Sequence, residues 1–492
     1  MDFSTTERSL QSLQRRTPDL SPQVKSIAAT LLTCHFSDPA FLKGTKELLG
    51  IGTRGESDEH ADPRWEPLAV GFYLTSSYLQ HATALYRNDD SNISDVYMEG
   101  PRVPTVDPAV VQKKVNVEGM QVSSPEDGIV ESDIVPFCEF IMAMCHGHLE
   151  HNEPRVRTLV AKVVGQHAKL GTTLKSQNEM GAAIIAQSVS LYNTVLISLY
   201  EHLDSGRDSE QMSKSTEGAL DDTTGWRALE TNLYGIGSFI QASGARYFEF
   251  SGDRNENCIS GGGVDEKLLK SVEHCCVTHV NRHVRAAGIN VLEQMIHACT
   301  ASFHKIDDAS TAELDGRGAI DMLLLPDSRL RQTIIAVLKT ALGDNWSQVR
   351  MAGSVLCRVF FVAMIEYAEN FPTKMEDREI WLTPIYPILL PRMCLNRFYL
   401  AQGVKLYSHE TWRILFDRSK GSAGAGIESV AMNAGAICRY YVKMADADNH
   451  VVREAACQAI AELANKIGRS EEHSHYLAPY VITLLQVSIC IC

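Results

Sequence analysis

The sequence has no excess of positive charge and no obvious membrane segment. Lys and Arg number 46 against 60 Asp and Glu, which gives a formal net charge of -14 over 492 residues. A general nucleic-acid binder needs clustered cations to neutralise phosphates, so this balance argues against that class. We find no uncharged apolar stretch of about 18 residues, and therefore predict no membrane span. The first segment, Met1 to Arg16, is polar and predicts no secretory signal.

Paired cysteine motifs are also lacking. The 13 cysteines are scattered, and several, such as Cys357 and Cys457, lie inside apolar helical patterns. Without a secretory signal, this distribution indicates reduced thiols in the cytosol or the nucleus. We therefore expect a cytoplasmic protein, with a nuclear location as the alternative.

Sequence motifs for phosphate binding and hydrolysis are missing as well. The segment Gly421–Gly426 lacks the Lys-Ser/Thr ending of a P-loop, and Gly235–Gly237 lacks the third glycine of a dinucleotide loop. Both are interpreted as turns or close-packing sites. We find no G-x-S-x-G elbow and no H-E-x-x-H helix. The sequence thus predicts a protein that is not an enzyme and needs no cofactor.

What the sequence does contain is a short helical phrase, Val followed by Arg, that recurs at wide intervals. After each Val, the positions 4, 7, 8 and 11 further on are apolar or small, apart from His167. This spacing places one stripe on one face of a helix. A stripe that recurs along a chain is typical of stacked helix pairs. The copies begin at Val156-Arg157, Val284-Arg285, Val349-Arg350 and Val452-Arg453, and a weaker copy begins at Asn396-Arg397.

The clearest predicted helix pair runs from Leu330 to Phe360. Gly343 stands where a glycine that ends a helix belongs, and Asp344 or Asn345 can cap the second helix. Sustained period-2 alternation is almost absent, so few strands are expected. Further pairs are predicted at Val430–Ile467 with Asp448 as the cap, at Leu268–Met295, and around a turn at His151–Pro154 where Asn152 can cap.

An Asp or Asn, then Val-Arg, a small residue and an apolar stripe resemble the second helix of HEAT repeats, in the armadillo-like class. Asn345–Phe360 and Asp448–Leu463 match best, whereas the Val284 copy has Val280 where the cap is expected. The resemblance implies an all-α fold, a right-handed α-solenoid superhelix of stacked antiparallel helix pairs. It also implies a non-enzymatic scaffold or adaptor that binds other proteins. Related scaffolds include microtubule-associated and transport-associated regulators, and this role is kept as an alternative function.

The resemblance is expected to cover residues 137–492, and residues 1–136 are expected to form a divergent helical region. Five segments are predicted to be polar inserts, interpreted as solvated linkers or, alternatively, as partner-binding or phosphorylated segments. At the other end, Tyr476–Gln486 is expected to be the first helix of a pair that lacks its second helix. The chain is thus hypothesised to be a shortened form of a longer repeat protein. The inserts are residues 50–62, 88–133, 204–225, 251–265 and 305–318.

Two groups of Cys and His residues contain the ligand types that zinc prefers. A metal-dependent enzyme built on His146, His148 and His151 is a minor alternative, because zinc needs about four ligands in a tetrahedral shell. Packing in the core is the favoured interpretation for both groups, so no metal is predicted. The first group is Cys138, Cys145, His146, His148 and His151, and the second is His274, Cys275, Cys276, His279 and His283, where Cys275, His279 and His283 are expected to share a helix face.

The recurring arginines are expected to bond a neighbouring pair and hold the stack together. In the alternative interpretation, these arginines form a ladder on the surface that binds an acidic partner. Trp346 lies in a turn, where it is expected to pack under the next repeat or to anchor a partner. The speculative partner-binding residues are therefore Trp346, Arg350 and Arg397, and the partner is expected to be one or more proteins rather than a nucleic acid.

Overall fold

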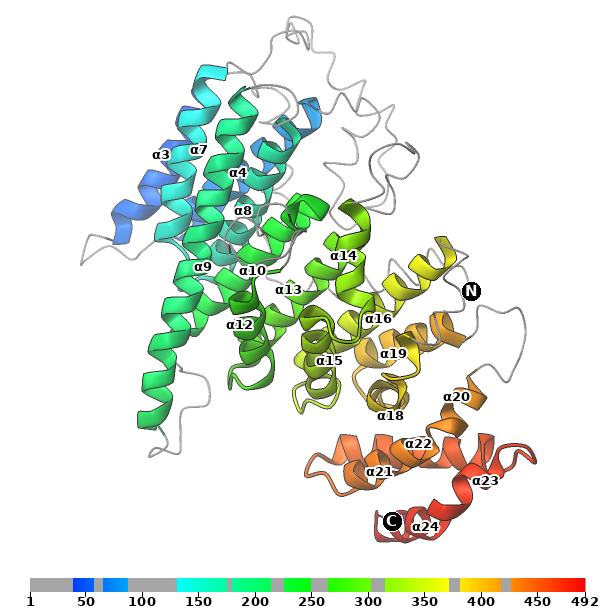
Figure 1. Cartoon of the computed structure of the whole chain (residues 1–492). Coiled ribbons are helices and arrows are strands. Elements are labelled where there is room, and N and C mark those ends of the chain that lie inside the picture. Colours follow the sequence, from blue (N-terminus) through cyan, green and yellow to red (C-terminus); the bar gives the residue numbers. More distant parts are fainter. Residues whose placement is uncertain are drawn as a thin grey trace, which may run out of the picture. The chain divides into compact units, whose positions relative to one another are not determined.

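All regular elements that the structure describes are helices. The computed structural model describes residues 39–56, 65–86, 131–174, 179–213, 225–248, 264–301, 315–370, 381–416 and 426–491 (Figure 1). No strand occurs in these ranges, and this confirms the predicted all-α class.

The described residues form two compact units. An N-terminal unit extends to Ser243, and a C-terminal unit begins at Gly244. The predicted boundary between residues 136 and 137 falls inside one continuous helix, α7 (Glu131–Gly147). The compact units divide at a different place, and the Val-Arg phrase occurs in both of them.

In the N-terminal unit, α8 is the central helix and packs against α4, α7, α9 and α10. Two of its glycines allow this close contact. A Cβ at Gly165 would lie 2.9 Å from the carbonyl oxygen of Ser238 in α10, and one at Gly171 would lie 3.0 Å from the backbone of Ile185 in α9. The helices of this unit are α3 (Pro39–Glu56), α4 (Trp65–Tyr86), α7, α8 (Pro154–Leu174), α9 (Glu179–Ser213) and α10 (Trp226–Ser243).

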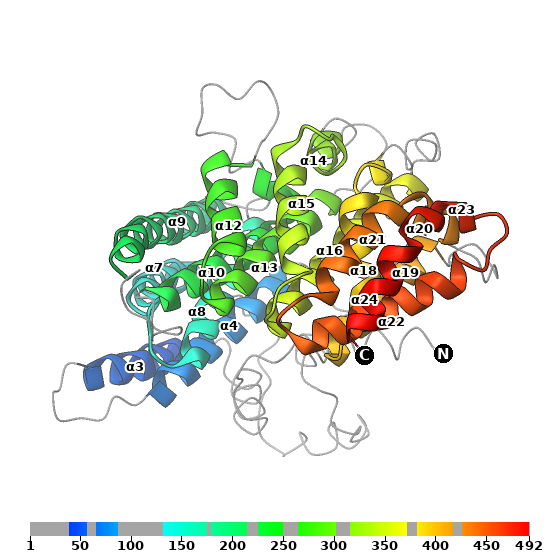
Figure 2. The same cartoon turned by 90° about the horizontal axis from the view of Figure 1, so that it is seen from below.

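The described residues of the C-terminal unit include four antiparallel helix pairs in sequence order (Figures 1 and 2). The first helices form a row in which α12 packs against α15, α15 against α18, and α18 against α21. The second helices α13, α16 and α19 pack in the same order, whereas α22 packs against α18 and α21. The pairs are α12 (Glu266–Val277) with α13 (Arg282–Thr300), α15 (Arg329–Ala341) with α16 (Ser347–Asn370), α18 (Tyr386–Asn396) with α19 (Gln402–Phe416), and α21 (Ala434–Ala445) with α22 (His450–Lys466).

Shorter elements flank these pairs: η1 (Gly244–Arg246), α14 (Asp315–Leu324), α20 (Ile427–Met432), α23 (Ser474–Leu477), η4 (Ala478–Tyr480) and α24 (Val481–Ile491). The last three correct a prediction, because Tyr476–Gln486 was expected to be one helix. Pro479 lies at the start of η4, where its missing amide and fixed φ interrupt a continuous helix. Leu477 and Leu484 are buried, but Val481 and Leu485 are 42% and 57% exposed.

The predicted stripes of the second helices are confirmed. Every stripe position of the four Val-Arg copies is buried, including the glycines. Burial of such a stripe contributes about 25 cal/mol for each Å² of apolar surface removed from water. The buried positions are Val160, Val163, Val164 and His167; Gly288, Val291, Leu292 and Met295; Gly353, Leu356, Cys357 and Phe360; and Ala456, Ala459, Ile460 and Leu463.

His167, the polar member of the α8 stripe, is completely buried and lies 2.6 Å from the Ser188 hydroxyl through Nδ1. Ser188 also lies 2.9 Å from the Ile184 carbonyl, to which it donates its single proton, so His167 Nδ1 is the donor to Ser188. No hydrogen-bond partner reaches the buried Nε2 in the described structure. Protonation at Nε2 would therefore leave an unpaired buried N–H, and burial lowers the pKa of His167 to about 4.

We expect the N-terminal unit to lose stability in acid. His167 has a folded-state pKa below its ordinary 6.5, so the unfolded chain binds more protons at pH values between 4 and 6.5. The loss between pH 7 and pH 5 should be about 2 kcal/mol from this residue alone. Pulse proteolysis in urea at both pH values measures it. In the His167→Leu variant, the free energy of unfolding should depend less steeply on pH. An unchanged slope would contradict the assignment of this acid sensitivity to His167.

The register of the third pair differs from the prediction. Asn396 ends α18, and α19 begins at Gln402, so Asn396-Arg397 does not start a second helix. Val404 occupies the buried position of the recurring Val, and Lys405 follows it. Asn396 instead donates to the Leu342 carbonyl at 3.0 Å, a contact that no periodic pattern reveals.

Helix capping is partly corrected. Asn449, rather than Asp448, caps α22 and accepts from the Val451 amide at 3.0 Å. Asn281 caps α13 in the same way, so the departure noted at Val280 does not remove the cap. At α13 and α22 the cap lies three residues before the Val, so Val280 lies in the preceding turn. At α16 the predicted Asp344 accepts from the Trp346 amide at 2.8 Å.

Two further turn predictions change. At the start of α8, Pro154 is the first helical residue as expected, but the side chain near the first-turn amides is Glu153 rather than Asn152. Gly343 has no positive φ. The chain leaves α15 through consecutive backbone hydrogen bonds that each span three residues. The glycine lies where a Cβ would be 3.3 Å from the Tyr440 hydroxyl.

The predicted inserts lie largely outside the described residues. The described helices nevertheless extend into four of them, because α3 continues to Glu56, α7 begins at Glu131, α9 continues to Ser213, and α14 begins at Asp315. Helix propensity at the ends of these elements therefore outweighs the polar composition on which the insert boundaries depended.

Two helical stretches are long and apolar enough to cross a membrane by length and composition, Gly181–Asp204 and Ser347–Tyr367. This differs from the expectation that no such stretch exists, because Gly181–Tyr200 lacks charged residues. The core helices of proteins without membrane spans pass the same test. In the second stretch, 72% of the apolar window is buried within the protein.

Candidate functional site

The first Cys and His group does not converge on a common point. The thiols of Cys138 and Cys145 are fully buried, as the core interpretation predicted, and burial raises the pKa of each to about 12. His148 Nδ1 lies 2.7 Å from the Met144 carbonyl, and His151 Nδ1 accepts from the Glu153 amide at 3.0 Å. These imidazole nitrogens are thus engaged by the backbone at the end of α7.

The second group is divided between two helices. Cys275 and Cys276 are buried at the end of α12, which ends at Val277, and His283 belongs to α13. The expectation that Cys275, His279 and His283 share one helix face is therefore wrong, because the Asn281 cap starts a new helix between them. Within the described residues, no three His, Cys, Asp or Glu side chains are grouped to hold a metal ion.

We expect most thiols to resist alkylation in the folded protein. Burial raises the pKa of Cys275 and Cys357 to about 12, so the reactive thiolate is scarce at pH 8. Cys457 is the partly exposed member of the described cysteines. Mass spectrometry after brief iodoacetamide treatment should therefore find Cys457 labelled before these two. Equal labelling of Cys357 and Cys457 without denaturant would contradict the burial.

The glycine segments serve packing and turns. Gly235 and Gly237 are buried within α10, and a Cβ at Gly235 would lie 3.5 Å from Val195 in α9. This fits their interpretation as close-packing positions. Of Gly421–Gly426, only Gly426 is described, and its φ of 81° starts α20 in the left-handed region.

The recurring arginines form the most regular polar feature of the chain. Three of them donate to carbonyls of the turn immediately before their own helix. Arg157 Nη1 bonds the His151 carbonyl at 2.8 Å, Arg350 Nε bonds the Asp344 carbonyl at 2.9 Å, and Arg453 Nη1 bonds the Ala447 carbonyl at 2.7 Å. A guanidinium at this position therefore satisfies backbone oxygens that the turn leaves without partners.

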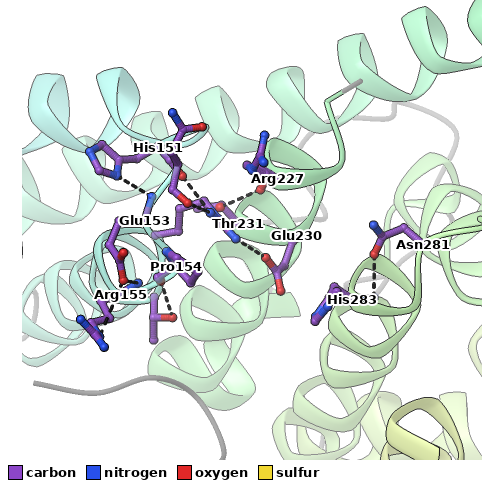
Figure 3. A network of polar contacts seen from close by, with 12 residues as sticks. His151, Glu153, Pro154, Arg155, Arg227, Glu230, Thr231, Asn281 and His283 are labelled. Carbon is purple, nitrogen blue, oxygen red and sulfur yellow. Dashed lines mark hydrogen bonds and ion pairs between the residues drawn. The ribbon is translucent and has the colours of Figure 1, made fainter. Parts of the chain in front are cut away.

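In the N-terminal unit, the guanidinium of Arg157 also reaches a neighbouring helix. Arg157 Nη2 forms an ion pair with Glu230 Oε2 of α10 at 2.8 Å, and the Trp226 ring centroid lies 5.5 Å from its guanidinium carbon. Figure 3 shows Glu230 on its helix and His151, Glu153 and Pro154 at the turn before α8. One arginine thus connects a turn with the neighbouring element.

In the C-terminal unit, successive arginines connect successive pairs. Arg285 of α13 forms an ion pair with Asp344, which lies in the turn of the next pair. Arg350 of α16 donates to Asn396 Oδ1 of the following pair at 2.7 Å, and its guanidinium carbon lies 4.2 Å from the Tyr399 ring centroid. Arg350 is completely buried, and this burial lowers its pKa below the ordinary 12.5. The structure therefore places Arg350 between pairs and does not offer it to a partner.

Arg397 is also buried, with 6% exposure, and it forms an ion pair with Glu462 of α22. Its guanidinium carbon lies 4.4 Å from the Trp412 ring centroid. Arg397, Trp412 and Glu462 line a small cavity of about 30 Å³, together with Lys466. A cavity of this size holds roughly one water molecule, so Arg397 connects α18 to α22 rather than forming a substrate pocket.

Trp346 is different from these arginines because it remains 47% exposed. The Arg282 guanidinium carbon lies 4.5 Å from its ring centroid, so the preceding pair contacts Trp346. The expected packing under the next repeat is therefore not observed. Among Trp346, Arg350 and Arg397, the tryptophan alone presents a large surface to solvent. The sequence did not identify Val280 and Leu400 as surface residues, although they are 50% and 75% exposed.

These contacts define an all-helical protein whose pairs are connected to their neighbours by buried guanidinium groups. A scan against models of known protein families finds no match, and a search of curated proteins finds no relative.

Proposed function

We propose that this chain is a non-enzymatic protein-binding scaffold and that its C-terminal unit is a HEAT-like α-solenoid. The observation that supports the proposal best is the pair of helix rows, in which α12, α15, α18 and α21 pack in order and α13, α16 and α19 do the same. In such a stack each pair depends on its neighbours for burial of its apolar stripe.

The use of polar residues supports the same function. The buried cations Arg350 and Arg397 bond atoms of neighbouring pairs, and the thiols Cys275 and Cys357 are buried within helices. Groups that would be reactive in an enzyme site are here engaged in packing. The surface that remains for recognition consists of helix faces and turns, which is how repeat proteins bind their partners.

Purification of the tagged full chain from its own cells, after mild crosslinking, tests this function. We expect one or more proteins to copurify in stoichiometric amounts. The variant Gly353→Ala, which disturbs the contact between α15 and α16, should retain less of the same protein. Recovery of the chain alone, under conditions in which known complexes of the same cells remain intact, would contradict the scaffold function.

A further inference from the structure

Three successive turns of the C-terminal unit each expose a large apolar side chain. Val280 lies between α12 and α13, Trp346 between α15 and α16, and Leu400 between α18 and α19. Their exposed fractions are 50%, 47% and 75%. We call these three residues the turn ridge. Val280 and Leu400 lie four residues before the buried Val of the following helix, and Trp346 lies three residues before it. Their exposure is not required by packing, because each following helix already buries its own core face.

The three turns are neighbours in space. Arg282, two residues after Val280, lies over Trp346 at 4.5 Å from the ring centroid. Gln348 Nε2 lies 3.5 Å from His283 Nδ1, which also joins the first and second turns. Arg350 lies 4.2 Å from the ring centroid of Tyr399, which directly precedes Leu400. The three turns that carry the ridge residues therefore lie next to one another in the C-terminal unit.

The charge around this edge is positive, although the whole chain is acidic. The turns 278–281, 342–346 and 397–401 contain one carboxylate, Asp344, and it is 8% exposed and paired with Arg285. Basic side chains follow the ridge positions at Arg282 and at the exposed Lys405. The fourth turn contains Asp446 and Asp448, so the positive edge ends before it.

We propose that the turn ridge binds an acidic segment of a partner protein that carries apolar anchor residues. The apolar anchors contact Val280, Trp346 and Leu400, and the carboxylates lie near Arg282 and Lys405. The net charge of -14 repels acidic partners from most of the molecule, so this local field orients the segment toward the ridge. Trp346 is held by the stacked Arg282 and provides a rigid aromatic contact. This inference rests on the proposed scaffold function and specifies the kind of partner.

The test is a selection of short random peptides displayed on phage against the full-length protein. Peptides that combine Asp or Glu with Leu, Phe or Trp should be enriched. Their affinity, measured by fluorescence anisotropy with synthetic peptides, should fall about tenfold in Leu400→Asp. Leu400→Lys provides the charge control: it removes the apolar contact but adds a positive charge, so it should lose less affinity than Leu400→Asp.

Ile482→Asp is the matched control outside the ridge. Ile482 is 73% exposed on α24, so the substitution is comparable to Leu400→Asp and should change peptide affinity by less than about twofold. Circular dichroism should show unchanged helix content in all three variants, because each position is on the surface. Enrichment of basic peptides, no enrichment, or equal loss of affinity in Ile482→Asp would overturn the ridge proposal.

The copurification experiment separates this proposal from the general scaffold function. If a stoichiometric protein copurifies equally with Leu400→Asp and with the unmodified chain, the scaffold function stands and the ridge proposal fails. If the protein is lost in Leu400→Asp and retained in Ile482→Asp, both proposals are supported.

Discussion

Arg350→Ala should destabilise the helix pairs on both sides of it by about 3 kcal/mol. Arg350 is completely buried and bonds the Asp344 carbonyl of its own pair and Asn396 of the next pair. Its removal leaves these oxygens without their donor and opens a cavity beside Tyr399. Pulse proteolysis in urea, read from the fragments of each unit, measures the loss.

Arg453→Ala is the control at the same position of the repeat. Arg453 is half-buried and bonds the carbonyls of Ala447 and Asp448 in its own turn, so its loss should cost about 1 kcal/mol. Equal destabilisation by Arg350→Ala and Arg453→Ala would mean that the bridge to the next pair contributes nothing measurable.

Gly353→Ala should destabilise the C-terminal unit by about 2 kcal/mol, although alanine favours helices. A Cβ at Gly353 would lie 2.8 Å from the Ala341 Cβ and 3.2 Å from the Ala341 carbonyl carbon. Backbone atoms cannot rotate away, so α15 and α16 must separate. Because apolar stripes of both helices meet at this contact, the separation also reduces burial on either side. The same proteolysis experiment measures the effect.

Gly403→Ala is the matched control for this substitution. A Cβ there would also approach an atom at 2.8 Å, but that atom is the sulfur of Met351. A thioether side chain can change rotamer, so the helix preference of alanine should nearly offset the crowding. If Gly353→Ala lowered stability no more than Gly403→Ala does, α15 and α16 would be able to separate at little cost in free energy.

The sequence predicted the features that depend on periodicity. The four Val-Arg copies carry their stripe at fixed spacing after Val, and the stripe of α16 from Gly353 to Phe360 is buried as expected. Periodicity records which face of a helix is apolar, and burial of that face decides where the helix packs. The all-α class followed for the same reason.

The turns were predicted less well, because turn geometry depends on contacts between distant residues. Asn396 looked like the start of a second helix, but its bond to the Leu342 carbonyl places it at the end of the first. Trp346 was expected to pack under the next repeat or to anchor a partner, yet the guanidinium over its ring, that of Arg282, comes from the preceding pair. Neither contact has a signal in local spacing.

The candidate surface was only partly predictable. Arg350 and Arg397 have the residue type that recognises acidic partners, but burial assigns both to packing between pairs. Val280 was noted only as an apolar residue where a helix cap is expected, and Leu400 follows the Asn396 copy as part of an apolar stripe. Their exposure becomes visible only when the caps fix where each turn begins and ends.

Hydrogen exchange of the Arg350→Ala variant, mapped by mass spectrometry along the chain, tests the central claim most directly. If each helix pair depends on its neighbours, the loss of protection should be largest in α15, α16, α18 and α19. It should become smaller toward α12 and α22 and be negligible in α4 and α8 of the N-terminal unit. A uniform loss of protection from α4 to α22 would show one cooperative core and would contradict the stacked arrangement.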